Sequence, residues 1–140
     1  MLQASLDIPA DKASMEAALE GLTRLNQVLL REAKRRGRPF PSLYRSGVRY
    51  NVKDGFAAWR TIPQIFRTKT GICSGLAAWR AAELRESGHP ARVIVRPSLS
   101  GIAGRWHAMV RCDTGIEDPS ARLGMPIDVA RAKRVNRRYL

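Results

Sequence analysis

The order of the predicted elements indicates a mixed α+β fold built as one domain. A long amphipathic helix comes first, a second helix begins in the middle of the chain, and a run of short strands follows it. Helices followed by antiparallel strands are typical of α+β proteins, whereas regular strand–helix alternation predicts a parallel sheet. A chain of 140 residues can bury one hydrophobic core. We therefore expect N-terminal helices packed on a small antiparallel sheet.

The first helix is predicted over residues 12–36. Apolar side chains recur there at intervals of three and four residues, which places them on one helix face: Met15, Leu19, Leu22, Leu25 and Leu29. Asp11 is of a type that caps helix N-termini, and Gly37 is of a type that ends helices. The pattern therefore predicts both ends of this helix and a buried leucine stripe along it.

The chain between the two helices is less regular. Residues 38–47 are rich in proline, serine and glycine and are predicted to form a loop. Residues 48–52 alternate as a short strand does, and the Asp-Gly pair at 54–55 would end it. The segment 56–66 is ambiguous, because Pro63 prevents one uninterrupted helix.

The second helix is predicted from Cys73 to Ser87, and Gly88 and Pro90 would stop it. Its apolar positions share one face, which Arg80 interrupts: Cys73, Leu76, Ala77, Ala81 and Leu84. The segments expected after it are a strand at 91–96, a loop over 97–104, strands at 105–111 and 116–118, and a short helix near 126–133. Within the single domain, we assign 1–47 to an N-terminal helix and loop, 48–126 to the core and 127–140 to a basic tail.

The charge is strongly positive. There are 25 Lys and Arg against 12 Asp and Glu, a formal net charge of +13, with dense clusters at 31–38 and 131–140. Such an excess predicts attraction to nucleic acid, anionic lipid or an acidic protein surface. Solvated basic faces on an arginine-rich protein explain the same composition, so charge alone does not choose a partner.

The sequence predicts a cytoplasmic protein without a membrane span. No apolar run reaches the roughly 18 residues that a spanning helix needs, and the N-terminus lacks the basic start and apolar core of a signal peptide. Two cysteines, Cys73 and Cys112, are too few for a disulfide framework, and free thiols are expected.

Cys73 is the candidate nucleophile. A cysteine at a helix N-terminus lies at the positive end of the helix dipole, beside unpaired backbone N–H groups that stabilise a thiolate. The same N–H groups can hold an oxyanion. Taken alone, the position also suits a small buried apolar residue. Cys112 falls in or beside a turn, without a helix terminus, and is predicted to be structural.

A thiolate nucleophile needs an imidazole and a group that orients it. His89 follows the helix that Cys73 begins, and about 14 residues at 1.5 Å each separate the two by about 20 Å. His107 lies in a later strand, and Asp118 follows 11 residues on. A hairpin turn centred on residues 112–113 would set His107 directly opposite Asp118, and one centred on 113–114 would make them diagonal neighbours. A histidine with a purely structural role fits the spacing as well.

Four motifs occur in an order typical of one family: Gly71-Ile72-Cys73, Gly88-His89-Pro90-Ala91-Arg92-Val93, His107-Ala108-Met109-Val110 and Asp118-Pro119. They resemble the transglutaminase-like branch of papain-fold cysteine enzymes over about residues 55–125. The strings GLAAWRAAELR and EDPSARLGM are also similar to small transglutaminase-like proteins of tailed bacteriophages. The resemblance implies a papain-like fold, in which Cys73 is the nucleophile, His107 the general base and acid, and Asp118 the orienting carboxylate.

The resemblance further implies acyl transfer from a protein or peptide amide through a thioester, to water or to an amine, without a metal or organic cofactor. Relatives carry acidic residues around the cysteine, where this chain has Ile72, Ser74 and Gly75. Gln64 and Trp59 lie upstream, where related folds place an oxyanion partner, and neither matches closely by spacing. Trp79 and Trp106 are expected to pack.

The alternative is a non-catalytic structural protein, such as a phage virion component, that keeps this fold and binds DNA or a protein neighbour through its basic surface. A plain nucleic-acid-binding module is less favoured, because the sequence carries no zinc, helix-turn-helix or aromatic RNA-binding signature.

Overall fold

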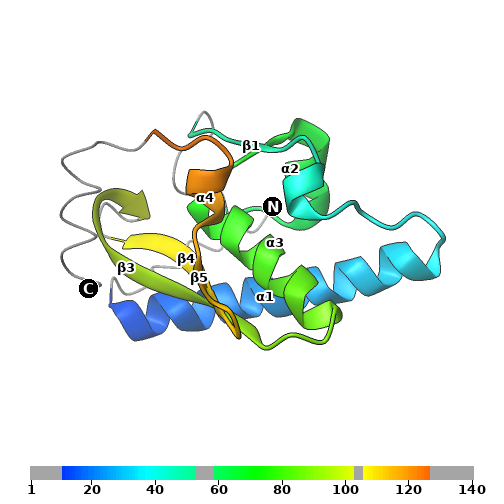
Figure 1. Ribbon diagram of the computed structural model, residues 1–140, viewed down its shortest axis with the longest axis horizontal. Coiled ribbons are helices and arrows are strands. Elements are labelled where there is room, and N and C mark those ends of the chain that lie inside the picture. Colours follow the sequence, from blue (N-terminus) through cyan, green and yellow to red (C-terminus); the bar gives the residue numbers. More distant parts are fainter. Residues whose placement is uncertain (1–10, 53–58, 103–105, 127–140) are drawn as a thin grey trace, which may run out of the picture.

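The computed structural model describes residues 11–52, 59–102 and 106–126, which form a mixed α+β arrangement of helices packed on small sheets (Figure 1). The helical elements are α1 (Lys12–Arg35), the 3-10 turn η1 (Leu43–Arg45), α2 (Ile62–Thr68), α3 (Cys73–Glu86) and α4 (Pro119–Arg122). The strands are β1 (Arg49–Tyr50), β2 (Thr70–Gly71), β3 (Ala91–Ile102), β4 (Trp106–Cys112) and β5 (Gly115–Glu117). The α+β class that the element order predicts is confirmed.

Both predicted ends of α1 are confirmed. The Asp11 carboxylate accepts a hydrogen bond from the Ser14 backbone N–H at 2.8 Å, which caps the helix. Gly37 follows the helix with φ +74°, a left-handed conformation that glycine adopts without steric cost. Local side-chain chemistry therefore marks where this helix starts and stops.

The buried face of α1 differs from the predicted leucine stripe. Leu25 is 47% exposed, and the fully buried positions after Leu19 are instead Thr23 and Asn26. From Met15, steps of four, four and three residues lead through Leu19 to Thr23 and Asn26, so these side chains share one helix face. The Leu25 side chain points about 100° away from that face. Thr23 Oγ1 donates to the Leu19 carbonyl, and Asn26 Oδ1 accepts from the Ile62 backbone N–H, whereas Asn26 Nδ2 is buried without a hydrogen-bond partner among the described residues.

Helix α3 lies in the middle of the molecule, between two apolar clusters (Figure 1). The first cluster joins α1, α3 and the inner face of β3 and β4, and includes Met15, Leu19, Cys73, Ala77, Ala81, Val93, Val95, Ala108 and Val110. The second joins α3 to α2, η1 and α4, and includes Leu43, Val48, Ile62, Ile65, Leu76, Trp79 and Leu123. The predicted apolar face of α3 is confirmed for Cys73, Ala77, Ala81 and Leu84, which lie in or against the first cluster, but Leu76 packs in the second. The helix is buried on opposite sides because elements from both halves of the chain cover it.

The three-stranded sheet is antiparallel in the order β3-β4-β5. Strand β3 continues to Ile102, so the loop predicted from residue 97 is wrong as far as the described residues extend. The pairing register shifts between Pro97 and Ile102, both of which pair with Trp106. Pro97 lacks an N–H and interrupts the ladder, and the strand resumes beyond it.

Two short helices have a proline in their first turn. Pro63 is the second residue of α2, where Thr61 and Gln64 form a capping box, so the ambiguous segment contains a helix. Pro119 is the first residue of α4, a helix that was not predicted. Strands β1 and β2 form a separate parallel pair.

Some predictions fall outside the described residues: the turn at 54–55, the start of the segment 56–66, the helix expected near 126–133 beyond residue 126, and the tail at 127–140. Over the described ranges, no helix combines the length and apolar character that crossing a membrane requires.

Candidate active site

Cys73 is the first residue of α3, as predicted, and follows the N-cap residue Ile72. The apolar side chain of Ile72 makes no capping hydrogen bond, so the N-cap residue leaves the amides of the first turn to other acceptors. The Cys73 side chain is only 2% exposed and belongs to the first apolar cluster. The thiol therefore lies in a buried position at the positive end of a 14-residue helix.

The His107 imidazole contacts the Asp118 carboxylate. Nε2 lies 2.9 Å from Oδ2 and 3.0 Å from Oδ1 of Asp118. Because an ionised carboxylate only accepts hydrogen bonds, this contact places the ring proton on Nε2 and leaves Nδ1 as the other interacting nitrogen. Asp118 Oδ1 also accepts from the Ala121 backbone N–H at 3.2 Å, so the carboxylate caps α4 as well.

The charge state of His107 depends on both neighbours. Burial lowers the pKa of this imidazole, but hydrogen bonds and charge interactions with Asp118 and Cys73 outweigh it and raise the pKa to about 9. The Cys73 side chain is therefore near enough to the imidazole to affect its pKa. At neutral pH the raised pKa favours the protonated imidazole. His107 thus contacts the Asp118 carboxylate and lies near enough to Cys73 for the two side chains to interact electrostatically.

The β4–β5 hairpin explains how Asp118 reaches His107. Val110 pairs with Glu117 and Cys112 with Gly115, so the turn is centred on residues 113–114. The direct pairing of His107 with Asp118, one of the two registers considered, is therefore wrong. Asp118 is the diagonal neighbour instead, and the length of the imidazole spans the extra separation.

The residues around Cys73 explain why acidic neighbours are absent. A Cβ placed on Gly75 would lie 2.7 Å from Ile65 Cδ1 and 3.3 Å from the Arg60 carbonyl oxygen. Ser74 is fully buried, and its hydroxyl has no hydrogen-bond partner among the described residues. Carboxylates at these positions would lack both space and partners, so the first turn of α3 is packed against α2 instead.

The other cysteine and histidine lie apart from this group. Cys112 is a free thiol at the end of β4, beside the β4–β5 turn, with Sγ 3.3 Å from Thr114 Oγ1. His89 is exposed beyond the end of α3, and its Nδ1 lies 3.0 Å from Asp113 Oδ2. Both placements agree with their predicted turn positions, and the His89–Asp113 contact was not predicted.

Gln64 and Trp59, which precede Cys73 and were considered as partners for an oxyanion, have different surroundings. The Gln64 side-chain oxygen accepts from the Thr61 backbone N–H at 2.9 Å, which engages it in the α2 capping box. Trp59 is partly buried against the cluster that contains Cys73.

The other two tryptophans pack in the core, as predicted. Trp79 is fully buried in the second cluster, and Trp106 packs against the first.

Sequence reasoning missed two charged residues next to the group. Arg80 of α3 forms a two-pronged ion pair with Glu117, the residue before Asp118. A signal was present, because an arginine that interrupts an apolar helix face needs a buried partner. The partner is 37 residues away in the chain, so spacing alone could not identify it.

The chain matches no protein-family model, no curated protein and no solved structure. The described residues also contain no group of three or more His, Cys, Asp or Glu side chains placed to hold a metal ion. The site's geometry is therefore the basis for a functional proposal.

Proposed function

We propose that this protein is a cysteine-dependent acyltransferase of papain-like, transglutaminase-like fold, acting on a protein or peptide amide as a peptidase, amidase or transamidase. The observation that carries the proposal is the contact of His107 with Asp118, on an imidazole whose pKa the Cys73 side chain also raises. A buried histidine could be structural, but this one contacts a carboxylate and lies near a thiol at a helix N-terminus. That combination supplies each part that thiol nucleophilic catalysis needs.

The chemistry follows from the charge state. The Cys73 thiol transfers its proton to His107, and the resulting imidazolium is stabilised by Asp118, in line with the raised pKa of His107. The thiolate sulfur bonds to the carbonyl carbon of the amide, and the carbonyl oxygen becomes an oxyanion. As the C–N bond breaks, His107 returns its proton to the departing amine and a thioester on Cys73 remains.

The second half of the reaction regenerates the thiol. Water or a substrate amine attacks the thioester carbon, His107 takes the proton of the attacking group, and the C–S bond breaks. The amides in the first turn of α3 are the candidate donors to the oxyanion in both halves. Trp59, which packs against the cluster around Cys73, is the candidate side-chain neighbour of that position.

Selective alkylation tests this proposal. In native protein carrying Cys112→Ser, iodoacetamide should modify Cys73 faster than it modifies a free thiol at neutral pH, and His107→Ala should lower that rate. Mass spectrometry after a short exposure measures both rates. Reaction no faster than a free thiol, with His107→Ala having no effect, would refute catalysis. Unfolded protein gives the reference rate for an unactivated Cys73.

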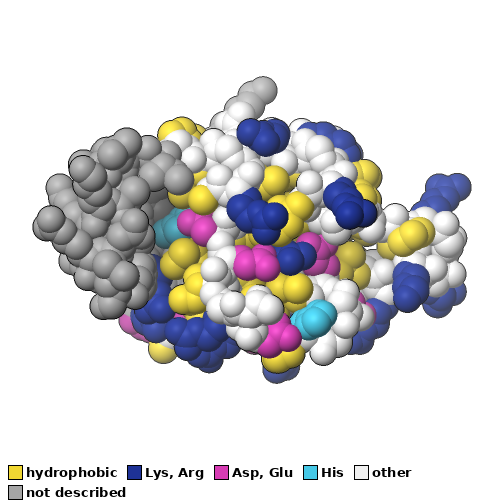
Figure 2. Space-filling model, viewed as in Figure 1, with side chains coloured by type: hydrophobic (Ala, Val, Ile, Leu, Met, Phe, Trp, Pro, Cys, Tyr) yellow, Lys and Arg dark blue, Asp and Glu magenta, His cyan; other side chains and the backbone are white. Residues whose placement is uncertain are grey.

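A second candidate is a non-catalytic structural protein that binds DNA or an acidic neighbour. The end of α1 projects from the rest of the molecule, and Figure 2 shows Lys and Arg side chains on that projection as well as across the face in view. Four basic residues are exposed there: Lys34, Arg35, Arg36 and Arg38. Arg35 and Arg36 share one carboxylate, Glu32, which leaves this end positive.

Salt-dependent DNA binding tests the second candidate. Duplex DNA should bind with an affinity that falls steeply as salt rises, and Lys34→Glu with Arg38→Glu should weaken it. Cys73→Ser should leave the binding unchanged. If the charge-reversed protein binds as tightly as the unchanged one, this surface is not the binding surface.

A further inference from the structure

A partly buried ion-pair network lies next to the candidate active site. Arg80 of α3 donates from Nε to Glu117 Oε2 at 2.7 Å and from Nη2 to Glu117 Oε1 at 3.0 Å. Its third donor, Nη1, contacts Glu83 Oε1 at 2.9 Å. Each of the three side chains is at most 20% exposed. This two-pronged geometry fixes the direction as well as the distance between Arg80 and Glu117.

The network connects the two elements that carry the proposed catalytic residues. Arg80 follows Cys73 by seven residues, which is two helical turns, so both lie on nearly the same side of α3, about 10.5 Å apart along its axis. Glu117 ends β5, and the next residue, Asp118, holds His107. One ion pair therefore ties the helix of the thiol to the strand end that presents the carboxylate.

Strand β5 has little else to fix its end. It is three residues long, and among the strands of the described residues it lies at the edge of the sheet and pairs only with β4. Additional contacts to Glu117 come from Tyr44, whose hydroxyl donates to Oε2 at 2.9 Å. The Arg122 guanidinium, on α4, lies 3.9 Å from the centre of the Tyr44 ring. Glu117, the residue before Asp118, is thus held by side chains from α3 and η1, and Arg122 of α4 packs on the same Tyr44 ring.

We infer that Arg80 and Glu117 are positioning residues, which keep the Asp118 carboxylate in contact with the His107 imidazole. Their importance for catalysis rests on the proposed function, but their effect on the imidazole does not. Arg80 pairs with Glu117, and Glu117 directly precedes Asp118 in the chain, so the pair acts on the ring through the placement of Asp118.

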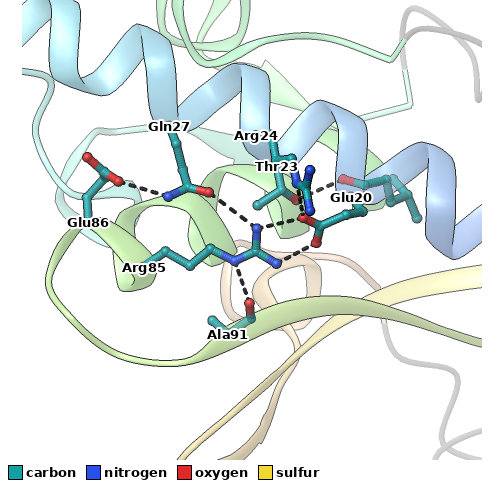
Figure 3. Close-up of polar contacts among 8 residues, drawn as sticks. Glu20, Thr23, Arg24, Gln27, Arg85, Glu86 and Ala91 are labelled. Carbon is teal, nitrogen blue, oxygen red and sulfur yellow. Dashed lines mark hydrogen bonds and ion pairs between the residues drawn. The ribbon is translucent and has the colours of Figure 1, made fainter.

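The same helix offers a matched pair that should lack this effect. Arg85 of α3 donates from Nη1 to Glu20 of α1 at 2.9 Å and from Nε to the Ala91 carbonyl at 2.7 Å (Figure 3). Gln27 and Glu86 extend this network toward Arg31. The Arg85–Glu20 pair has a partly buried geometry similar to that of Arg80–Glu117 but joins α1 to the far end of α3.

NMR titration of the His107 ring protons separates positioning from mere stabilisation. Arg80→Gln with Glu117→Gln keeps the net charge, and so does the control, Arg85→Gln with Glu20→Gln. The first variant should lower the pKa of His107 by about 1 unit, toward the value without a well-placed carboxylate. The control should lower the unfolding midpoint by a similar amount and leave the pKa of His107 unchanged.

An unchanged pKa of His107 in the Arg80–Glu117 variant would overturn the inference, as would an equal shift in the control. If the double variant does not fold, Glu117→Gln alone gives the same comparison against Glu20→Gln. Iodoacetamide rates for Cys73 at neutral pH, measured on the same proteins, should fall severalfold only in the Glu117 variants. If wild-type Cys73 shows no His107-dependent reactivity, the proposed function fails, and the titration still decides the positioning role.

Discussion

His107 Nε2 contacts both oxygens of Asp118, at 2.9 and 3.0 Å, although the two residues are diagonal neighbours and not opposite ones. The same carboxylate caps α4 through the Ala121 backbone N–H. Asp118 therefore serves the imidazole and the helix together, because the end of β5 and the start of α4 meet at this residue. Substitutions must separate these two roles before either can be measured.

Asp118→Asn should lower the pKa of His107 while keeping the helix cap. Asparagine caps helices about as well as aspartate, but it removes the negative charge, and an opposite charge at this distance shifts a pKa by about 1–3 units. We expect a fall of that size from about 9 in an NMR titration of the ring. Asp118→Ala should cost about 1 kcal/mol more in unfolding free energy than Asp118→Asn, since it also loses the cap. A pKa that stays near 9 in Asp118→Asn would contradict the assigned role of the carboxylate.

Stability should fall as the pH rises through the range in which His107 titrates. The pKa of His107 is raised in the folded protein from its usual 6.5 to about 9. Its contribution to stability is therefore fully present below about pH 6.5 and is lost as the pH rises through about 9, on the order of 3 kcal/mol in total. Urea unfolding over this range measures it, with His107→Gln as the control that should lack this component. Parallel pH curves for the two proteins would show that His107 is not the group responsible.

The sequence predicted those parts of the fold whose ends are marked locally. Asp11 caps α1, Gly37 follows it in a left-handed conformation, and Gly88 at φ +87° follows α3. Helix α4 was not predicted, because it is four residues long and depends on a cap from Asp118. The full length of β3 was not predicted either, because a proline such as Pro97 usually indicates the end of a strand unless the partner strand is known.

The residue types of the candidate site, and their order along the chain, could be predicted from the sequence. A cysteine at a helix start, and a histidine with an aspartate across a hairpin, are visible as patterns. The buried setting of Cys73 is not, because Cys73 packs in a cluster whose other members come from distant segments of the chain, α1, β3 and β4 among them. The role of Arg80 depends on contacts between distant segments, which no local periodicity encodes.

Asn26→Ala should destabilise the protein by about 1–3 kcal/mol, because it leaves the Ile62 N–H at the start of α2 without its acceptor. Thr23→Val is the matched control on the same buried face. Thr23 Oγ1 donates to Leu19 O, a carbonyl within α1, so its loss should cost less. Urea unfolding of the two variants compares them directly. Equal losses would show that the Asn26–Ile62 bond adds nothing beyond side-chain burial.

Gly75→Ala should destabilise the protein by about 1–3 kcal/mol, because the new methyl group would lie 2.7 Å from Ile65 Cδ1 and the first turn of α3 would be overpacked. Ile65→Val removes that methyl carbon, so Gly75→Ala should cost less in the Ile65→Val background. Gly21→Ala is the control: it lies in α1 with nothing within 4 Å of its new Cβ, and it should stabilise by about 0.5–1 kcal/mol through helix propensity. Thermal unfolding of the four Gly75/Ile65 combinations gives the coupling between the two positions. A coupling near zero would mean that the close approach of α2 to the start of α3 does not explain the glycine beside Cys73.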